Sequence, residues 1–210
     1  MPKILLAAFA ALLFSVQTVN ADTYVAGQHY EVLPSPVLTR DKNKIEVVEL
    51  FWYGCSHCFS FEPMLGTWAN QLPEDVDFPQ VPAVWNKTME LHARAFYTAN
   101  ALGILDKVPQ PFFTALNVER QRLNNQGSIA TFFSKFGVEK KTFDNTFNSF
   151  GVNSQVKLAE SRAVSYRMQG TPEIVVNGKY RVAGNLAGSH ENMLKVAQFL
   201  VNKERAERNK

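Results

Sequence analysis

The pattern of apolar and polar positions predicts three elements in the first half of the chain. The segment KIEVVELFWY, residues 44–53, is rich in β-branched and aromatic residues and is bounded by polar residues and Gly54, so it predicts a buried strand. Residues 59–72 predict a helix with a weak point at Pro63, because a proline this deep removes a helical hydrogen bond. Residues 76–84 contain two prolines, which predicts an irregular or edge strand.

The middle of the chain, residues 88–166, contains no convincing strand pattern. Five segments carry apolar residues at helical spacing, and they are residues 89–103, 110–123, 128–137, 140–151 and 153–170. Four of the five end on glycine, and Ser128 is placed to cap the third. This part of the sequence therefore predicts a helical block.

The last part of the chain returns to strands. TPEIVV and KYRVAG flank Asn177-Gly178, which is the strongest short-range signal for a β-hairpin. Ser189 is expected to cap a final helix over residues 190–205, with Glu191 in its first turn and basic residues at its end. Because each end of the chain supplies only part of a sheet, the order of elements predicts one α/β unit interrupted by an inserted helical domain.

The N-terminus predicts export. It has one positive charge at Lys3, an unbroken apolar run over residues 4–14, and small residues three and one before a cut after Ala21. The run is too short to span a bilayer and has no polar face, which disfavours the alternative of a buried N-terminal helix. Residues 1–21 are therefore expected to be a cleaved signal peptide, with a mature protein that begins at Asp22.

Composition adds limits on size and partners. The chain has 210 residues, 46% of them hydrophobic, which suits one globular domain or one domain with a sizeable insertion. The formal net charge is +3, with acids and bases interspersed. This balance gives no argument for binding to nucleic acid or to a strongly anionic partner.

The only two cysteines, Cys55 and Cys58, lie in the segment ELFWYGCSHCFSFEP. In an exported protein such a pair is most often a structural disulfide. A loop of about four residues, however, would stabilise the fold by only about 2 kcal/mol, against about 4.7 kcal/mol for a 100-residue loop. A zinc site is also disfavoured, because it needs four ligands and His57 cannot easily converge with both neighbouring cysteines. Reactive thiols are the reading that best fits the spacing.

The position of the pair supports this chemistry. A Gly-Cys-x-x-Cys segment that follows a strand and opens a helix places Cys55 at the helix N-terminus, where free backbone N–H groups favour the thiolate. Cys58 lies one turn further in and is less open to solvent. A protonated His57 would lower the pKa of Cys55 further, although an isolated histidine is more often simply solvated. A low pKa of Cys55 would make the disulfide an oxidant.

The cysteine segment, together with GTPEIVVNGKYRVAG further along and the helical block between them, resembles the DsbA-type thiol:disulfide oxidoreductases of the bacterial periplasm. The resemblance covers essentially the whole mature chain. It implies an α/β thioredoxin fold with an inserted all-helical domain. The thioredoxin domain would comprise residues 22–87 and 167–210, and the helical insertion would comprise residues 88–166.

The resemblance also implies roles for individual residues. Cys55 would form the mixed disulfide with substrate, and Cys58 would resolve it. Glu49 matches the acid that the family buries beneath the active site to move the proton of Cys58; from the pattern alone it could equally be an edge residue facing water. Pro172 matches the family's cis-proline, and the preceding Thr171 would offer backbone hydrogen bonds to substrate.

Two positions depart from the family pattern. The usual dipeptide between the cysteines is proline-histidine, and here it is Ser56-His57; the usual residue before the cis-proline is valine, and here it is Thr171. Threonine at that place is more typical of the periplasmic isomerases and reductases. Because both positions lie beside the reactive sulfur, they are expected to tune the reduction potential of the cysteine pair. The isomerases carry an N-terminal dimerisation domain for which this chain has no room, so an oxidase is favoured.

The expected substrates are reduced, unfolded exported proteins, held by apolar surface around Trp52, Tyr53, Phe59 and Pro172, although each aromatic alone is more typical of a core. A DsbB-like, quinone-linked membrane protein would reoxidise the pair in the periplasm, through transient contact only. No metal or organic cofactor is implied beyond the Cys55–Cys58 disulfide. The alternatives are a reductase or isomerase of the same fold, or a non-catalytic exported binding domain with a structural disulfide.

Overall fold

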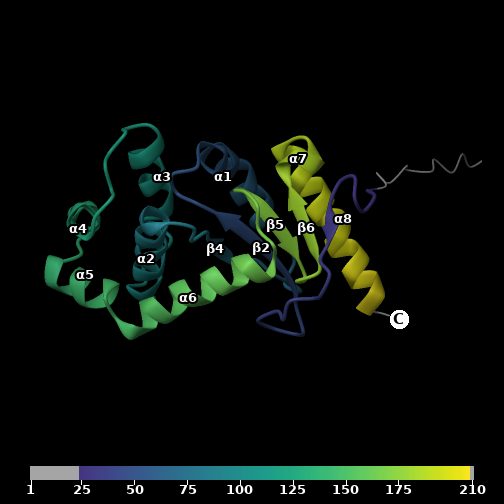
Figure 1. The fold of residues 1–210 in the computed structure, drawn as a ribbon, viewed down its shortest axis with the longest axis horizontal. Coiled ribbons are helices and arrows are strands. Elements are labelled where there is room, and N and C mark those ends of the chain that lie inside the picture. Colours follow the sequence, from purple (N-terminus) through teal and green to yellow (C-terminus); the bar gives the residue numbers. More distant parts are fainter. Residues whose placement is uncertain (1–23, 209–210) are drawn as a thin grey trace, which may run out of the picture.

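A mixed β-sheet forms the centre of the protein, with helices on both faces (Figure 1). The computed structural model describes residues 24–208, so the predicted signal peptide lies outside the described residues. The strands are β1 (Glu31–Val32), β2 (Ile45–Phe51), β3 (Val76–Asp77), β4 (Gln80–Pro82), β5 (Glu173–Val176) and β6 (Tyr180–Ala183). Their order is β1-β6-β5-β2-β3, and β4 also pairs with β2. Strand β2 runs parallel to β3 and β4 and antiparallel to β5.

Strand β2 is buried along its whole length, as its apolar sequence predicts. Its side chains alternate between two cores. Ile45 and Val47 pack against the helices α1 (Ser56–Ala69) and α8 (His190–Arg208). Val48 and Leu50 pack on the opposite face, in a cluster that includes Tyr166, the C-cap residue of helix α6 (Phe150–Ser165). The alternation directs Glu49 toward the face that α1 covers.

Five helices lie between β4 and β5 and form the insertion. They are α2 (Lys87–Ala101), α3 (Pro109–Asn117), α4 (Gln126–Ser134), α5 (Lys140–Phe147) and α6 (Phe150–Ser165). In Figure 1 they gather beside the sheet, and α6 runs back from them to the sheet. Their aromatic core also takes in Phe51, Tyr53 and Cys58, so the insertion packs against the end of β2 where the cysteines lie. The thioredoxin fold with a helical insertion is confirmed, whereas the domain boundaries after residues 87 and 166 stay predictions.

The predicted hairpin is confirmed, with β5 and β6 paired antiparallel. Both turn residues have positive φ, 50° at Asn177 and 62° at Gly178, as a two-residue turn of this kind requires. Gly178 also lies against the backbone of Val37, whose carbonyl oxygen would be 2.0 Å from a Cβ at that position. Ser189 caps α8, because its Oγ accepts a hydrogen bond from the Asn192 N–H.

Several predicted boundaries are wrong. Helix α4 is capped by Asn125, whose side chain accepts from the Ser128 N–H, so Ser128 is not the cap. Gly151 lies inside α6 and does not end the helix before it, since Ser149 caps α6. Helix α3 ends at Asn117, well before residue 123.

The remaining differences concern short or extended elements. Helix α1 begins at Ser56, three residues earlier than the predicted segment, and continues through Pro63. The irregular edge segment is two short strands, β3 and β4. Strand β1 and the one-turn helix α7 (Gly184–Ala187) were not predicted, because neither is long enough to show a hydrophobic period. No helix within residues 24–208 is both long and apolar enough to span a bilayer.

Candidate active site

The two cysteines lie at the start of α1. Cys55 is the N-cap residue, with extended backbone angles, and its Sγ accepts a hydrogen bond from the Cys58 N–H at 3.4 Å. Both cysteines are free thiols, so the structure shows the reduced form of the pair. Cys55 is partly exposed, whereas Cys58 is fully buried. One sulfur therefore faces solvent and the other faces the core.

Thr171 meets Cys55 from the other end of the chain. The Sγ of Cys55 lies 3.2 Å from the carbonyl oxygen of Thr171, to which the thiol donates a hydrogen bond when it is protonated. The peptide bond between Thr171 and Pro172 is cis. The fold thus brings the cysteine segment and the threonine-proline segment together.

The surroundings of the two sulfurs push their pKa values in opposite directions. Hydrogen bonding to Cys58, then to the Thr171 side chain and to the backbone amides of Cys58 and His57, lowers the pKa of Cys55 to about 5. Burial raises the pKa of Cys58 far above its usual range, and the neighbouring Cys55 and Glu49 raise it further. At neutral pH the reduced pair is therefore a Cys55 thiolate beside a Cys58 thiol.

An acid pair lies beneath the cysteines. Glu49 is completely buried, and its Oε2 accepts a hydrogen bond of 2.7 Å from Gln80 Nε2. The same Gln80 nitrogen lies 3.5 Å from Glu62 Oε1 on helix α1. Burial raises the pKa of Glu49 well above its usual value, and the charge of Glu62 adds to the effect. Burial likewise raises the pKa of Glu62 to about 7.

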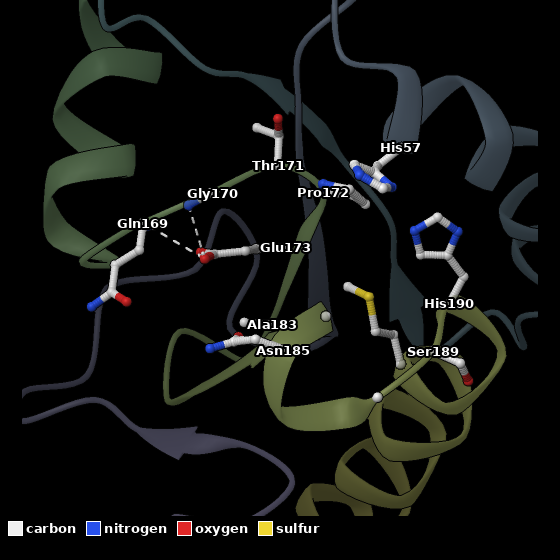
Figure 2. A pocket seen from close by; sticks show the side chains of 13 residues that line it. His57, Gln169, Gly170, Thr171, Pro172, Glu173, Ala183, Asn185, Ser189 and His190 are labelled. Carbon is white, nitrogen blue, oxygen red and sulfur yellow. Dashed lines mark hydrogen bonds between the residues drawn. The ribbon is translucent and has the colours of Figure 1, made fainter.

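A cavity of about 640 Å³ opens beside the cysteines. Figure 2 shows His57 and His190 on one side of it and Glu173 and Asn185 on the other, with Pro172 near the histidines. The two imidazole rings lie edge to face, with centroids 6.2 Å apart.

Comparison with known proteins identifies the family. A family model described as a DSBA-like thioredoxin domain matches residues 68–192. The thiol:disulfide interchange protein DsbA of Pseudomonas aeruginosa is 42% identical over 187 residues, which are 89% of this chain and 89% of that protein. The protein of the same name from Azotobacter vinelandii is 42% identical over 180 residues, 86% of this chain and 84% of that protein.

Solved structures agree. The crystal structure of Pseudomonas aeruginosa DsbA superposes with a TM-score of 0.86 at 42% identity, covering 90% of this chain and 99% of that one. The oxidoreductase DsbA from Xylella fastidiosa superposes with a TM-score of 0.82 at 34% identity, covering 87% and 98%. The chain belongs to the DsbA family. It is a thiol:disulfide oxidoreductase with a CXXC active site, Cys55-Ser56-His57-Cys58.

The structure places most of the predicted site residues of this DsbA family member together. Cys55, Cys58, Thr171 and Pro172 meet at one point, and Glu49 lies beneath them as a buried acid, which decides between the two readings of that residue. Ser56 and His57 are exposed on the first turn of α1. His57 contributes to the low pKa of Cys55 through its backbone amide.

The predicted substrate surface needs a correction. Tyr53 is only 1% exposed and packs between Phe112 and Phe113 of the insertion, so it cannot contact substrate. Trp52 and Phe59 are partly exposed, and the otherwise buried Pro172 lines the cavity. Strand β2 ends at Phe51, and Tyr53 lies in the turn that follows, where its ring also packs edge to face against Phe51.

Sequence reasoning missed two residues of the site. Glu62 lies four residues after Cys58, on the same face of helix α1, and that spacing is a signal that could have found it. Gln80 has no comparable signal, because its place beside Glu49 depends on the pairing of β4 with β2. Among residues 24–208, no cluster of three or more His, Cys, Asp or Glu side chains is arranged to hold a metal ion.

Proposed function

We propose that the chain oxidises reduced, unfolded exported proteins by donating the Cys55–Cys58 disulfide. A substrate thiolate attacks Cys55 Sγ, the Cys55–Cys58 bond breaks, and Cys58 leaves and takes up a proton. A second thiolate of the substrate then attacks the sulfur bound to Cys55, and Cys55 leaves as a thiolate. The substrate loses two electrons to the cysteine pair, which ends as the reduced form seen in the structure.

The observation that carries this proposal is the contrast between the two sulfurs. The low pKa of Cys55 makes it the better leaving group in the second step and stabilises the reduced protein relative to the disulfide. The raised pKa of Cys58 means that the buried thiolate is disfavoured, so this sulfur must take up a proton as it leaves in the first step. The low pKa of Cys55 is therefore the effect that favours oxidation of the substrate.

Glu49 is proposed to supply and later recover the proton of Cys58. It is buried on the face of β2 that α1 covers, and its raised pKa allows it to hold a proton near neutral pH. The amide of Gln80 links it toward Glu62, which is closer to solvent. Together these groups provide a path by which the proton can reach water.

Thr171 and Pro172 are proposed to bind the substrate backbone beside Cys55, with Ser56 and His57 tuning the thiolate from the opposite side. Support comes from the Thr171 contact with the sulfur and from the cavity that Pro172 and His57 line. An extended peptide bound along Thr171 and Pro172 could place its cysteine on Cys55 while a neighbouring side chain enters the cavity.

The partner and compartment follow from family membership and from the N-terminal sequence. We propose that residues 1–21 direct export to the periplasm and are removed after Ala21. A DsbB-like membrane protein linked to quinone would then reoxidise the cysteine pair. The apolar run and small residues at the N-terminus support the leader, and the family supports the partner.

A second candidate is a reductase or isomerase, and Thr171 is the residue that favours it. The equilibrium between the cysteine pair and glutathione separates the two candidates. If the protein is an oxidase, its reduction potential should lie well above that of thioredoxin, about −270 mV, and closer to the reference value for DsbA, about −120 mV. A reduction potential near that of thioredoxin would overturn the oxidase proposal. The Cys58→Ser variant lacks the resolving thiol, so its Cys55 thiolate should attack a peptide disulfide, release one peptide thiolate and accumulate a mixed disulfide at Cys55. Failure to accumulate this mixed disulfide would contradict the assigned roles.

A further inference from the structure

A buried ion pair lies directly behind the threonine-proline segment, and the proposed reaction does not use it. Glu173 begins strand β5 and is 2% exposed, and Arg181 lies on the neighbouring strand β6 and is 1% exposed. Arg181 Nη1 donates to Glu173 Oε1 at 2.9 Å. Burial raises the pKa of Glu173, and the charge of Arg181 opposes this effect and helps to keep the carboxylate ionised.

The same carboxylate oxygen also holds the backbone before Thr171. Glu173 Oε1 accepts hydrogen bonds from the N–H of Gly170 at 3.1 Å and from the N–H of Gln169 at 3.3 Å. Figure 2 shows both bonds reaching back from β5 to the loop at the edge of the cavity. The carboxylate thus closes residues 169–172 into a loop that presents the Thr171 carbonyl to Cys55.

Arg181 is held from its other side by the N-terminal part of the chain. Its Nη2 donates to Glu31 Oε2 at 2.6 Å, and Glu31 lies on strand β1 with 45% of its side chain exposed. The three residues form a row from the surface to the active-site loop. The innermost, Glu173, is the one that accepts hydrogen bonds from that loop.

Stability alone is a poor explanation for this arrangement. Replacing a buried ion pair by apolar residues of similar size is often neutral or stabilising, because the charges lose their hydration on burial. A carboxylate is, however, well suited to fix two backbone N–H groups at once, because charge-assisted hydrogen bonds are stronger and shorter than neutral ones. The geometry therefore indicates a positional role.

We propose that Glu173 is a positioning residue for the thiol exchange, which clamps the 169–172 loop so that Thr171 stays against Cys55, while Arg181 holds the clamp in place. The inference rests on the proposed role of Thr171 at the site. Because a hydrogen bond from the Thr171 side chain helps to lower the pKa of Cys55, release of the loop should appear in the acidity of that thiol as well as in substrate binding.

The test compares two double variants that both lack the ion pair. Glu173→Gln/Arg181→Met keeps a side-chain oxygen that can accept from the loop, whereas Glu173→Leu/Arg181→Met does not. The pKa of Cys55 is measured from the ultraviolet absorbance of its thiolate, and KM and kcat are measured for oxidation of a reduced peptide. We expect the Gln variant, which keeps only a neutral acceptor and lacks Arg181, to shift the Cys55 pKa and KM slightly. The Leu variant should show a pKa higher by about one unit and a KM higher by about threefold.

Glu31→Gln is the matched control. It removes the outer partner of Arg181 without touching the loop, so it should lower the melting temperature slightly and leave both the Cys55 pKa and KM unchanged. Equal Cys55 pKa and KM values in the two double variants would overturn the proposal, and so would a Glu31→Gln effect as large as that of Glu173→Leu/Arg181→Met. The thiolate measurement does not depend on the direction of exchange, so failure of the oxidase proposal would be seen separately.

Discussion

The indole Nε1 of Trp52 donates a hydrogen bond of 3.0 Å to Nδ1 of His92, which joins the end of the central strand to the first helix of the insertion. Because Nδ1 accepts, the proton of the neutral ring must be on Nε2, and this nitrogen donates to the Leu123 carbonyl at 2.9 Å. A second proton on Nδ1 would point at the indole N–H. The bond therefore requires a neutral His92, which is 2% exposed.

This requirement predicts acid sensitivity. Burial lowers the pKa of His92 to about 4, against about 6.5 for an unfolded histidine. The unfolded state therefore binds more protons between these values, and the stability that the neutral ring contributes, on the order of 3 kcal/mol, is present above pH 6.5 and is lost as the pH falls toward 4. Urea unfolding across this range should show a shallower pH dependence in His92→Gln than in the wild type. If His92→Gln showed the same pH dependence of the unfolding free energy as the wild type, His92 would not be held as a neutral ring.

Replacement of Gly54 is expected to destabilise the protein, because any side chain at this position would clash with the same indole. A Cβ at this position would lie 2.3 Å from the Trp52 ring, which His92 holds in place. Gly54→Ala should displace the ring and cost about 1–3 kcal/mol in the free energy of unfolding. The cost should shrink in a Trp52→Val background, which a double-mutant cycle measures.

Gly66 provides the matched control for that substitution. It lies in α1 with nothing within 4 Å of its would-be Cβ, so Gly66→Ala should stabilise the protein by up to about 1 kcal/mol through helix propensity. If Gly54→Ala were equally harmless, the contact with Trp52 would not constrain the active-site loop.

Local signals accounted for the elements that the sequence predicted well. The strand before the cysteines is a continuous apolar run, and the hairpin turn has residues that tolerate positive φ, so both depend on neighbours in sequence. The helix cap at Asn125 shows the limit of such signals. Asn125 and Ser128 are both good capping residues, and the choice between them depends on where packing lets the helix begin.

The polar residues beneath the cysteines could not be fixed from sequence alone. Glu49 reads as either a core acid or an edge residue until the partners of its strand are known, and here β4 and β5 flank it. In the sequence, His92 is an ordinary position of a segment with helical spacing. Its contact with Trp52 joins residues 40 apart in sequence, and no spacing rule predicts such a pair.

The acid pair predicts an opposite pH dependence in the reduced protein. Burial raises the pKa of Glu62 to about 7, so the folded state holds a proton that the unfolded state, with a pKa of about 4.3, has already lost. The stability from the neutral acid is therefore present at pH 4 and is lost as the pH rises through 7. Glu62→Gln should flatten this decline and be more stable than the wild type at pH 8, as measured by thermal unfolding of the reduced protein. As a control, substitution of the exposed Glu74 by Gln should change neither the decline in stability with pH nor the stability at pH 8.

Thr171→Val tests how the residue beside the cysteine tunes the potential. Valine keeps the shape of threonine and the backbone carbonyl that meets Cys55, but it removes the hydroxyl that lowers the pKa of the thiol. The pKa of Cys55 should rise by about one unit, and the reduction potential should fall by about 30 mV because the thiolate of the reduced form is less stabilised. Thr171→Ser, which keeps the hydroxyl, should stay close to the wild type in both measurements. If valine instead made the protein more oxidising, as its presence in typical DsbA oxidases would suggest, the hydroxyl would act mainly on the disulfide form and the account of the thiolate given by the reduced structure would be wrong.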